Sequence, residues 1–188
     1  MPNIISLLHN FDIKLFTIMK KRNVALIIFG IITLIIQGTI ISESFANGQI
    51  SSSHSSGFTQ MIIDWVGDIN PEAYIFTHQE EFRAFARKLF GHFLLFGGLG
   101  FFSMLSLSCL EGAYKKKKVE IVVTCMSFGL GNAFFSELIQ TFIPGRSGEI
   151  KDVLIDFSGF ILFSLIIFVI LLIINNIQEK KKNVSTLG

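Results

Sequence analysis

The apolar residues of this chain are gathered into four long blocks, and polar residues fill the segments between them. The blocks cover residues 24–41, 89–110, 121–143 and 153–177. As a helix, even the shortest block reaches about 27 Å, which is close to the thickness of a bilayer core. The pattern therefore predicts an all-α, polytopic membrane protein with four transmembrane helices, organised as one domain over residues 1–188.

The longest segment outside these blocks is the predicted external loop, residues 42–87. Its serine-rich part, residues 51–57, has little means of forming a core and is expected to be flexible. Pro71 should interrupt the loop, and a short helix over about residues 79–88 should lead into the second span. Five apolar residues recur at helical spacing between these parts: Phe58, Met61, Ile62, Trp65 and Val66. This spacing predicts a helix lying in the membrane interface, with Trp65 as its anchor.

Lysine and arginine residues gather beside the predicted spans. If both termini are cytoplasmic, eleven of the 16 lie inside and five outside, an asymmetry that the positive-inside rule favours. The inner set is Lys14, Lys20, Lys21, Arg22, Lys115, Lys116, Lys117, Lys118, Lys180, Lys181 and Lys182, and the outer set is Arg83, Arg87, Lys88, Arg146 and Lys151. We therefore expect a multi-pass protein of the cell membrane with cytoplasmic N- and C-termini.

The basic clusters and the net charge of +2 indicate contact with anionic membrane lipids rather than with nucleic acid. The first block also resembles a signal peptide, because a basic lead precedes it and Ser44-Phe-Ala46 resembles a cleavage site. The block is longer than the apolar core of a signal peptide, however, so we expect a retained helix. Cys109 and Cys125 match no metal motif and are expected to be reduced and to serve helix packing.

Ionisable side chains inside the apolar blocks are the strongest functional signal. The helical rise places Glu137 about 9 Å below the outer end of the third span, and Gln140 one turn above it. His92 and Asp156 each lie about 6 Å below the outer ends of the second and fourth spans. Hydrocarbon tolerates such groups poorly, so a shared depth on three helices predicts one functional site.

Helical spacing also predicts which faces meet. Three stripes combine polar with small or aromatic residues: residues 149, 152, 156 and 159; residues 129, 133, 137 and 140; and residues 88, 92, 96 and 100. Small residues let transmembrane backbones approach closely, so we expect tight packing below a polar pocket that opens outward. Pro144 and Gly145 should reverse the chain, and Arg146 would then fold back over the acidic stripes.

Structural interpretations of the same residues stay open. Glu137 could form an ion pair with Arg146, Gln140 could join helices, and Asp152 could stabilise a helix N-terminus. His92 and Asp156 could be buried packing residues, while Arg87 and Lys88 could extend to the interface. The candidate set has three parts: acid–base groups Glu137, His92 and Asp156; ligand-binding residues Arg87, Lys88, Gln140, Arg146 and Asp152; and structural residues Pro144, Gly145 and Gly159.

Four motifs along residues 83–165 resemble those of the VanZ-like family. They are Arg87-Lys-Leu-Phe-Gly-His92 with Phe96, Ser136-Glu137-x-x-Gln140, Pro144-Gly145-Arg146, and Asp152-Val153 followed by Gly159. The resemblance implies a helical membrane protein of the bacterial envelope, in a family whose named member is associated with low-level teicoplanin resistance. The chain departs from the family pattern at Asp156, where Asn is frequent, and at Phe96, where an aromatic hydroxyl is frequent.

Three functions follow as hypotheses. The leading one is glycopeptide resistance through an outer-leaflet pocket that binds a lipoglycopeptide antibiotic or a lipid-linked cell-wall precursor. The second is an intramembrane enzyme that acts on a lipid-linked or acylated substrate through Glu137, His92 and Asp156. The third is a non-catalytic interaction protein. We expect no cofactor and assign no metal ligand, although the same three side chains are competent to bind a divalent cation.

Overall fold

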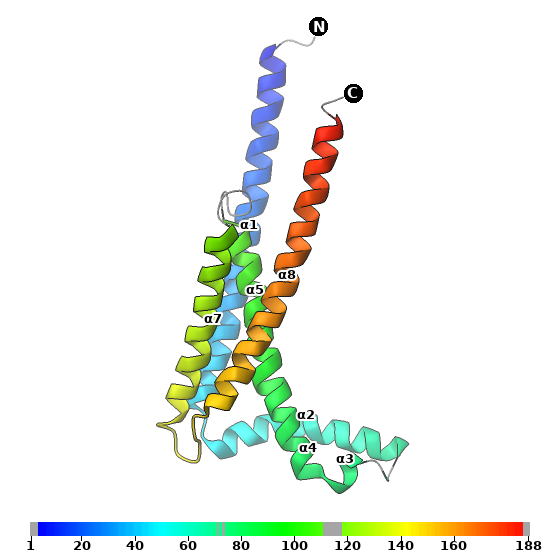
Figure 1. Ribbon diagram of the computed structural model, residues 1–188, viewed down its shortest axis with the longest axis vertical. Coiled ribbons are helices and arrows are strands. Elements are labelled where there is room, and N and C mark those ends of the chain that lie inside the picture. Colours follow the sequence, from blue (N-terminus) through cyan, green and yellow to red (C-terminus); the bar gives the residue numbers. More distant parts are fainter. Residues whose placement is uncertain (1–3, 71, 73, 111–117, 186–188) are drawn as a thin grey trace.

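The computed structural model describes residues 4–70, 72, 74–110 and 118–185, and all regular structure in these ranges is helical (Figure 1). The predicted all-α class is therefore confirmed. In chain order the elements are α1 (Ile4–Phe45), α2 (Gly48–Ile69), α3 (Tyr74–Thr77), α4 (Gln79–Ala86), the π-helix η1 (Arg87–Leu94), α5 (Leu95–Ser108), α7 (Lys118–Gln140) and α8 (Ile150–Ser185).

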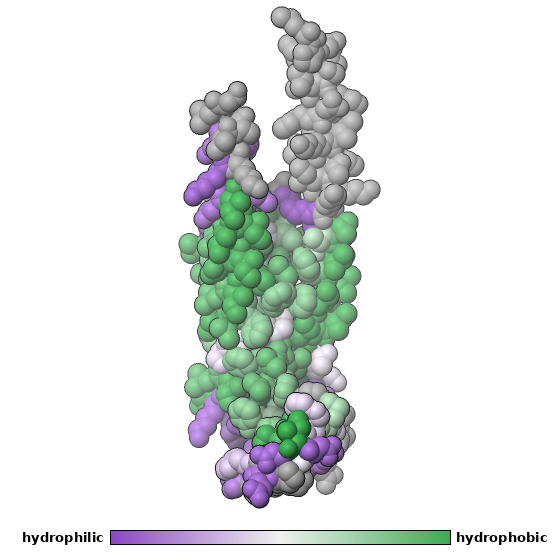
Figure 2. Space-filling view, turned by 90° about the vertical axis from the view of Figure 1, so that its right-hand side faces the viewer, coloured by the Kyte–Doolittle hydropathy of each residue, from purple (hydrophilic) through white to green (hydrophobic). Residues whose placement is uncertain are grey.

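Four helical stretches are long and apolar enough to cross a membrane, as predicted: Arg22–Phe45, Gln79–Ser108, Lys118–Gln140 and Ile150–Lys180. The two chain ends lie at the same end of the bundle, and the loop between α7 and α8 lies at the opposite end (Figure 1). Large apolar side chains such as Ile31, Leu34 and Ile166 are exposed on the outer faces of these helices. On the face shown in the space-filling view, apolar residues cover the middle of the bundle and polar residues gather toward its ends (Figure 2).

Several predicted boundaries were wrong. The third span does not reach residue 143, because α7 ends at Gln140 and the next residues form three-residue turn bonds, Phe142 N to Ile139 O and Ile143 N to Gln140 O. Pro144 lacks the N–H that a longer helix would need. The second span is one continuous helical segment from α4 through η1 into α5, so it begins before residue 89. The first helix, α1, begins at Ile4 and includes most of the segment that precedes the first apolar block.

The serine-rich stretch is helical rather than flexible. It belongs to α2, which runs across the end of the bundle (Figure 1). Serine costs only a fraction of a kcal/mol in a helix, and burial of Thr59 and Ile63, on the helix that packs against α4 and η1, offsets that cost. Met61 and Trp65 stay exposed, as an interfacial anchor requires. The predicted break at Pro71 and the cluster at residues 115–117 lie outside the described residues.

Glycines set the distance between α8 and its neighbours. A Cβ on Gly159 would collide with the backbone oxygen of Phe93 in η1, and one on Gly100 would collide with the backbone of Phe160. On the other side of the bundle, Gln37 of α1 donates a 3.1 Å hydrogen bond to the side-chain oxygen of Asn132 in α7. Close backbone approach and interhelical amide bonds are the usual means of packing helices in hydrocarbon.

We predict that Gly159→Ala destabilises the protein by about 1–3 kcal/mol, because the added methyl pushes α8 away from η1. Reversible unfolding in mixed micelles measures this loss. Gly131→Ala is the matched control, since a Cβ there meets nothing within 4 Å and alanine favours the helix by up to about 1 kcal/mol. Equal stability of the two variants would contradict the packing argument.

Candidate functional site

The π-helix η1 carries three of the predicted site residues: Arg87, Lys88 and His92. In a π-helix the hydrogen bonds join residues i and i+5, so each turn is wider than in an α-helix. Arg87 and His92 are five residues apart and line the same two cavities. Long π-helices are rare and such turns are frequent at functional sites. The apolar periodicity of the sequence does not distinguish this π-helix from an α-helix.

His92, Glu137 and Asp156 converge at the centre of the site, one from each of η1, α7 and α8. His92 Nδ1 lies 3.0 Å from Asp156 Oδ1 and 4.0 Å from Glu137 Oε1. Asp156 is fully buried, Glu137 is 3% exposed, and the His92 side chain is 13% exposed. The grouping expected from helical depth is therefore present, while the roles of the three residues stay predictions.

Glu137 joins the end of α7 to the start of α8. Its Oε1 accepts a 2.7 Å hydrogen bond from Gln140 Nε2, and its Oε2 accepts a 3.0 Å bond from the backbone N–H of Glu149. Gly148 makes the second bond possible, because a Cβ there would collide with the backbone oxygen of Glu137. Hydrogen bonds from N–H donors favour a charged carboxylate.

The chain reverses at Pro144 and Gly145. The N–H of Arg146 donates to Ile143 O at 3.1 Å, and Gly145 has φ 76°. Proline at the second position and glycine with positive φ at the third are typical of a type II turn. The predicted reversal is therefore present, and it directs Arg146 back toward the bundle.

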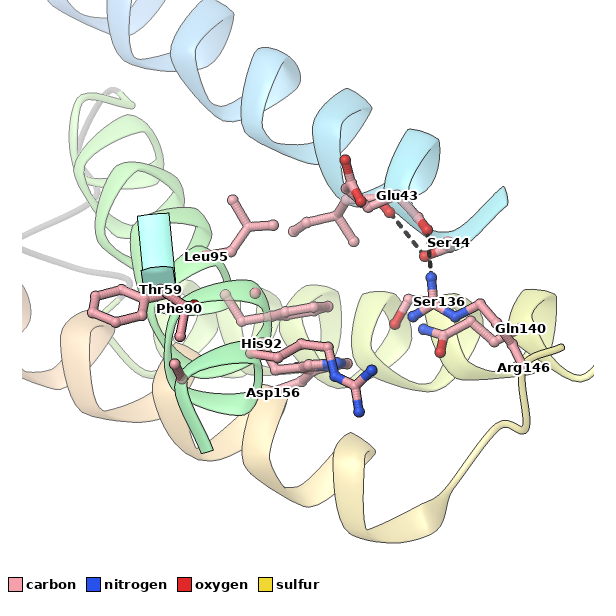
Figure 3. Close-up of a pocket in the computed structure, with 15 residues that line it drawn as sticks. Glu43, Ser44, Thr59, Phe90, His92, Leu95, Ser136, Gln140, Arg146 and Asp156 are labelled. Atoms are coloured by element: carbon pink, nitrogen blue, oxygen red, sulfur yellow. Dashed lines mark hydrogen bonds and ion pairs between the residues drawn. The ribbon is translucent and has the colours of Figure 1, made fainter. Parts of the chain in front are cut away.

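Arg146 folds back over the site as predicted, but among the described residues it forms no ion pair with Glu137, the structural alternative. Its Nη1 donates to the carbonyl oxygen of Glu43 at 2.7 Å, at the C-terminal end of α1 (Figure 3). It also lies 3.4 Å from the carbonyl oxygen of Ala46. The last carbonyls of a helix have no partner within it and carry partial negative charge, so a guanidinium stabilises them. Burial lowers the pKa of Arg146 from its usual value and the nearby Glu137 opposes this shift. The group stays protonated at physiological pH.

Lys88 and Asp152 form a separate ion pair between η1 and α8. Lys88 Nζ lies 2.5 Å from Asp152 Oδ1 and 3.9 Å from Glu149 Oε2. Both predicted ligand-binding residues thus already have a charged partner. Arg87, which is exposed at the rim, has no hydrogen-bond or ion-pair partner among the described residues.

Two adjoining cavities meet at these side chains. The larger, of about 340 Å³, combines Arg87, His92, Gln140, Arg146 and Asp156 with an apolar wall that includes Ile40, Phe90, Leu95 and Phe96. The smaller, of about 220 Å³, is polar and reaches the turn at Gly145 and the pair Lys88–Asp152. Arg87, His92, Gln140 and Arg146 border both.

The end of α1 is the part of the site that the sequence did not reveal. Ile40, Glu43 and Ser44 line the larger cavity, and the carbonyls that bind Arg146 belong to the same turn. The sequence signal in this region, Ser44-Phe-Ala46, indicates only a resemblance to a cleavage site. Because α1 packs against α5 and α7, it is part of the bundle that encloses the site. Retention of this helix in the mature protein stays a prediction.

A scan against protein-family models matches residues 24–173 to the model described as VanZ/LLP1. The chain belongs to the VanZ/LLP1 family. The match covers most of the chain and confirms the resemblance that the motifs around His92 and Pro144 predicted. It also covers the end of α1, so the whole wall of the larger cavity falls inside the VanZ/LLP1 region. No curated protein and no solved structure matches the chain significantly.

We predict that Arg146→Ala destabilises this VanZ/LLP1 protein by about 1–3 kcal/mol, because two carbonyls at the end of α1 lose a charged donor. The loss should be accompanied by faster proteolysis near residue 46. Lys151→Ala, which removes an exposed cation of α8, should leave stability and proteolysis unchanged. The same loss in both variants would argue against a specific role of Arg146.

Proposed function

We propose that this VanZ/LLP1 protein binds an amphipathic, anionic ligand in its larger cavity and thereby lowers the susceptibility of the cell to teicoplanin-like glycopeptides. The ligand is an acylated glycopeptide or a lipid-linked cell-wall precursor. The observation that carries the proposal is the pairing, in one cavity, of two guanidinium groups with an apolar wall.

The cations of this cavity suit a phosphate or carboxylate. Arg87 has no ionic partner in the described part of the chain, and Arg146 uses one nitrogen for the α1 carbonyls. The two guanidinium groups are close enough to repel, since Arg87 contributes to the lowered pKa of Arg146. An anion between them would remove this repulsion and accept hydrogen bonds from both.

The apolar residues of the cavity suit a hydrocarbon chain. Ile40, Phe90, Leu95 and Phe96 line it, and they belong to helices whose outer faces are apolar enough to meet lipid. A volume of about 340 Å³ accommodates a head group with part of a chain. A ligand of the membrane can thus place its charged group at the arginines while its tail extends into the bilayer.

An intramembrane enzyme is the second candidate, and the His92–Asp156 pair favours it. A carboxylate bonded to one imidazole nitrogen fixes the tautomer and leaves the other nitrogen to accept a proton. Glu137 Oε1 lies 4.0 Å from Nδ1, the imidazole nitrogen that contacts Asp156. His92 and Asp156 both line the larger cavity, so this acid–base pair is available to a bound ligand. This hypothesis requires that the bound ligand be converted rather than only held.

The cavity must face the outside of the cell for this function. We predict that Ser147→Cys, in a variant with Cys109 and Cys125 replaced by Ala, reacts with a membrane-impermeant thiol reagent added to intact cells. Ser147 is exposed in the turn and avoids the positive φ of Gly145. Lys182→Cys, at the opposite end, should react only after the cells are opened. The reverse pattern would exclude an outer-leaflet site.

We also predict that Arg87→Gln weakens binding of an acylated glycopeptide at least about tenfold, because a hydrogen bond between charged groups is worth about 1.5–3 kcal/mol. Binding is measured on protein in nanodiscs, and antibiotic susceptibility on cells with matched protein levels. Wild-type protein and Lys151→Gln should bind the glycopeptide and protect cells equally.

The same samples separate the candidate functions. A glycopeptide without its acyl tail should bind weakly, and mass spectrometry should recover the bound ligand intact. Ligand that is converted by wild-type protein but not by Asp156→Asn, which keeps an oxygen for the contact with His92, would favour the enzyme. Unchanged susceptibility and binding in Arg87→Gln would refute the proposed role of the cavity.

A further inference from the structure

We propose that His92, Glu137 and Asp156 form a binding site for one divalent first-row metal ion, Zn²⁺ or Mn²⁺. The site deepens the proposed function, because His92 and Asp156 line the larger cavity and an ion between them would contribute to ligand binding there. It does not depend on the identity of that ligand.

The three donor atoms are close enough to share one ion. The imidazole nitrogen and the two carboxylate oxygens all lie within 4.8 Å of one another. At metal–ligand distances near 2.0–2.2 Å, tetrahedral or octahedral angles separate neighbouring ligands by about 3.0–3.6 Å. The separation of 3.0 Å between His92 Nδ1 and Asp156 Oδ1 falls in that range, and the 4.0 Å between His92 Nδ1 and Glu137 Oε1 exceeds it by about 0.4 Å. Small side-chain rotations would therefore complete the coordination.

The charge of the cluster calls for a cation. Two carboxylates are buried here, and the only basic side chain within 4.0 Å of either, among the described residues, is His92. Lys88 is engaged by Asp152, and Arg146 donates to backbone carbonyls. Even a protonated imidazole leaves one negative charge uncompensated in a region of low dielectric, which is costly. A divalent ion with a neutral imidazole balances both carboxylates.

An unsatisfied atom supports the same conclusion independently. Asp156 Oδ2 is buried and has no hydrogen-bond partner in the described part of the chain. Buried polar atoms in folded proteins nearly always have a partner, and an orphan requires an explanation. Asp156 is itself fully buried and lines the cavity, so an ion that its carboxylate binds through both oxygens would also give Oδ2 a partner.

Neighbouring groups hold Glu137 as they hold typical metal ligands. Gln140 and the N–H of Glu149 donate to its two oxygens, and each oxygen keeps a further lone pair. Outer hydrogen bonds of this kind orient ligating carboxylates and strengthen metal binding. The other members come from the rigid helices η1 and α8, so all three donors are held in place before an ion arrives.

The donor set decides the kind of ion. Imidazole suits zinc and other first-row metals, while carboxylates suit manganese as well. Calcium requires six to eight oxygen ligands and magnesium keeps most of its waters, so three donors with one nitrogen fit neither ion well. Three protein ligands also leave coordination positions open, and these are available to a phosphate or carboxylate group in the cavity.

The test measures metal bound by the full-length protein. After treatment with a chelator, protein in detergent is equilibrated with Zn²⁺ or Mn²⁺, freed of excess ion and analysed by mass spectrometry for metal content. We expect about one equivalent for wild-type protein. Asp68→Asn, which alters an exposed carboxylate of α2, should bind the same amount. Asp156→Ala and His92→Ala should each reduce binding at least tenfold, because each removes a ligand.

Melting temperature provides the second readout. Addition of the ion should raise it for wild-type protein and for Asp68→Asn, but not for Asp156→Ala. Wild-type protein that retains less than a tenth of an equivalent would overturn the proposal, whatever the variants do. Equal binding by wild type and by the two alanine variants would also overturn it. Metal binding without glycopeptide binding would refute only the proposed function, and the reverse result would refute only the metal site.

Discussion

Two carboxylates buried inside a membrane-spanning bundle are the constraint on which the rest of this structure depends. Hydrocarbon offers them no water, so each needs donors or a positive charge supplied by the protein or by a bound ion. Glu137 obtains two N–H donors, one from its own helix and one from the start of α8. Asp156 obtains only His92 among the residues that the structure describes. The short α7–α8 loop, the tight contact at Gly148 and the close approach of α8 to η1 all serve to bring these groups together.

The sequence predicted the centre of the site well because helix geometry is nearly invariant. The rise and period of an α-helix fix the depth and face of Glu137 and Asp156 without knowledge of their neighbours. His92 lies in the π-helix η1, so the same count gives its position only approximately. The π-helix and the partner of Arg146 could not be predicted in this way. The partner of Arg146 depends on hydrogen bonds between segments distant in sequence, from Arg146 to the end of α1. The π-helix has local hydrogen bonds between residues i and i+5, but apolar periodicity does not distinguish them from α-helical bonds. The prediction that the serine-rich stretch is flexible was wrong for a related reason, since packing of α2 on α4 and η1 overrides its weak helix propensity.

The arginines connect this buried centre with the cavity. Arg146 secures the end of α1 and thereby completes the cavity wall formed by Ile40, Glu43 and Ser44. Lys88 is neutralised by Asp152 on the neighbouring helix, which leaves Arg87 as the cation at the rim without an ionic partner among the described residues. The positive charge available to a ligand is therefore separated from the negative charge of the buried cluster, although both border one cavity. Such a separation suits a ligand with an anionic group.

Asp156 is the site residue whose negative charge is not needed for the packing of the helices. The charge of Glu137, by contrast, also serves the packing, because its two oxygens accept hydrogen bonds from Gln140 and from the backbone N–H of Glu149. An amide at residue 137 would change the charge and the link between α7 and α8 together. Asp156 contacts only His92 through one oxygen and leaves the other unpartnered in the described structure. Its negative charge is therefore more than helix packing requires, and a bound cation gives that charge a physical reason.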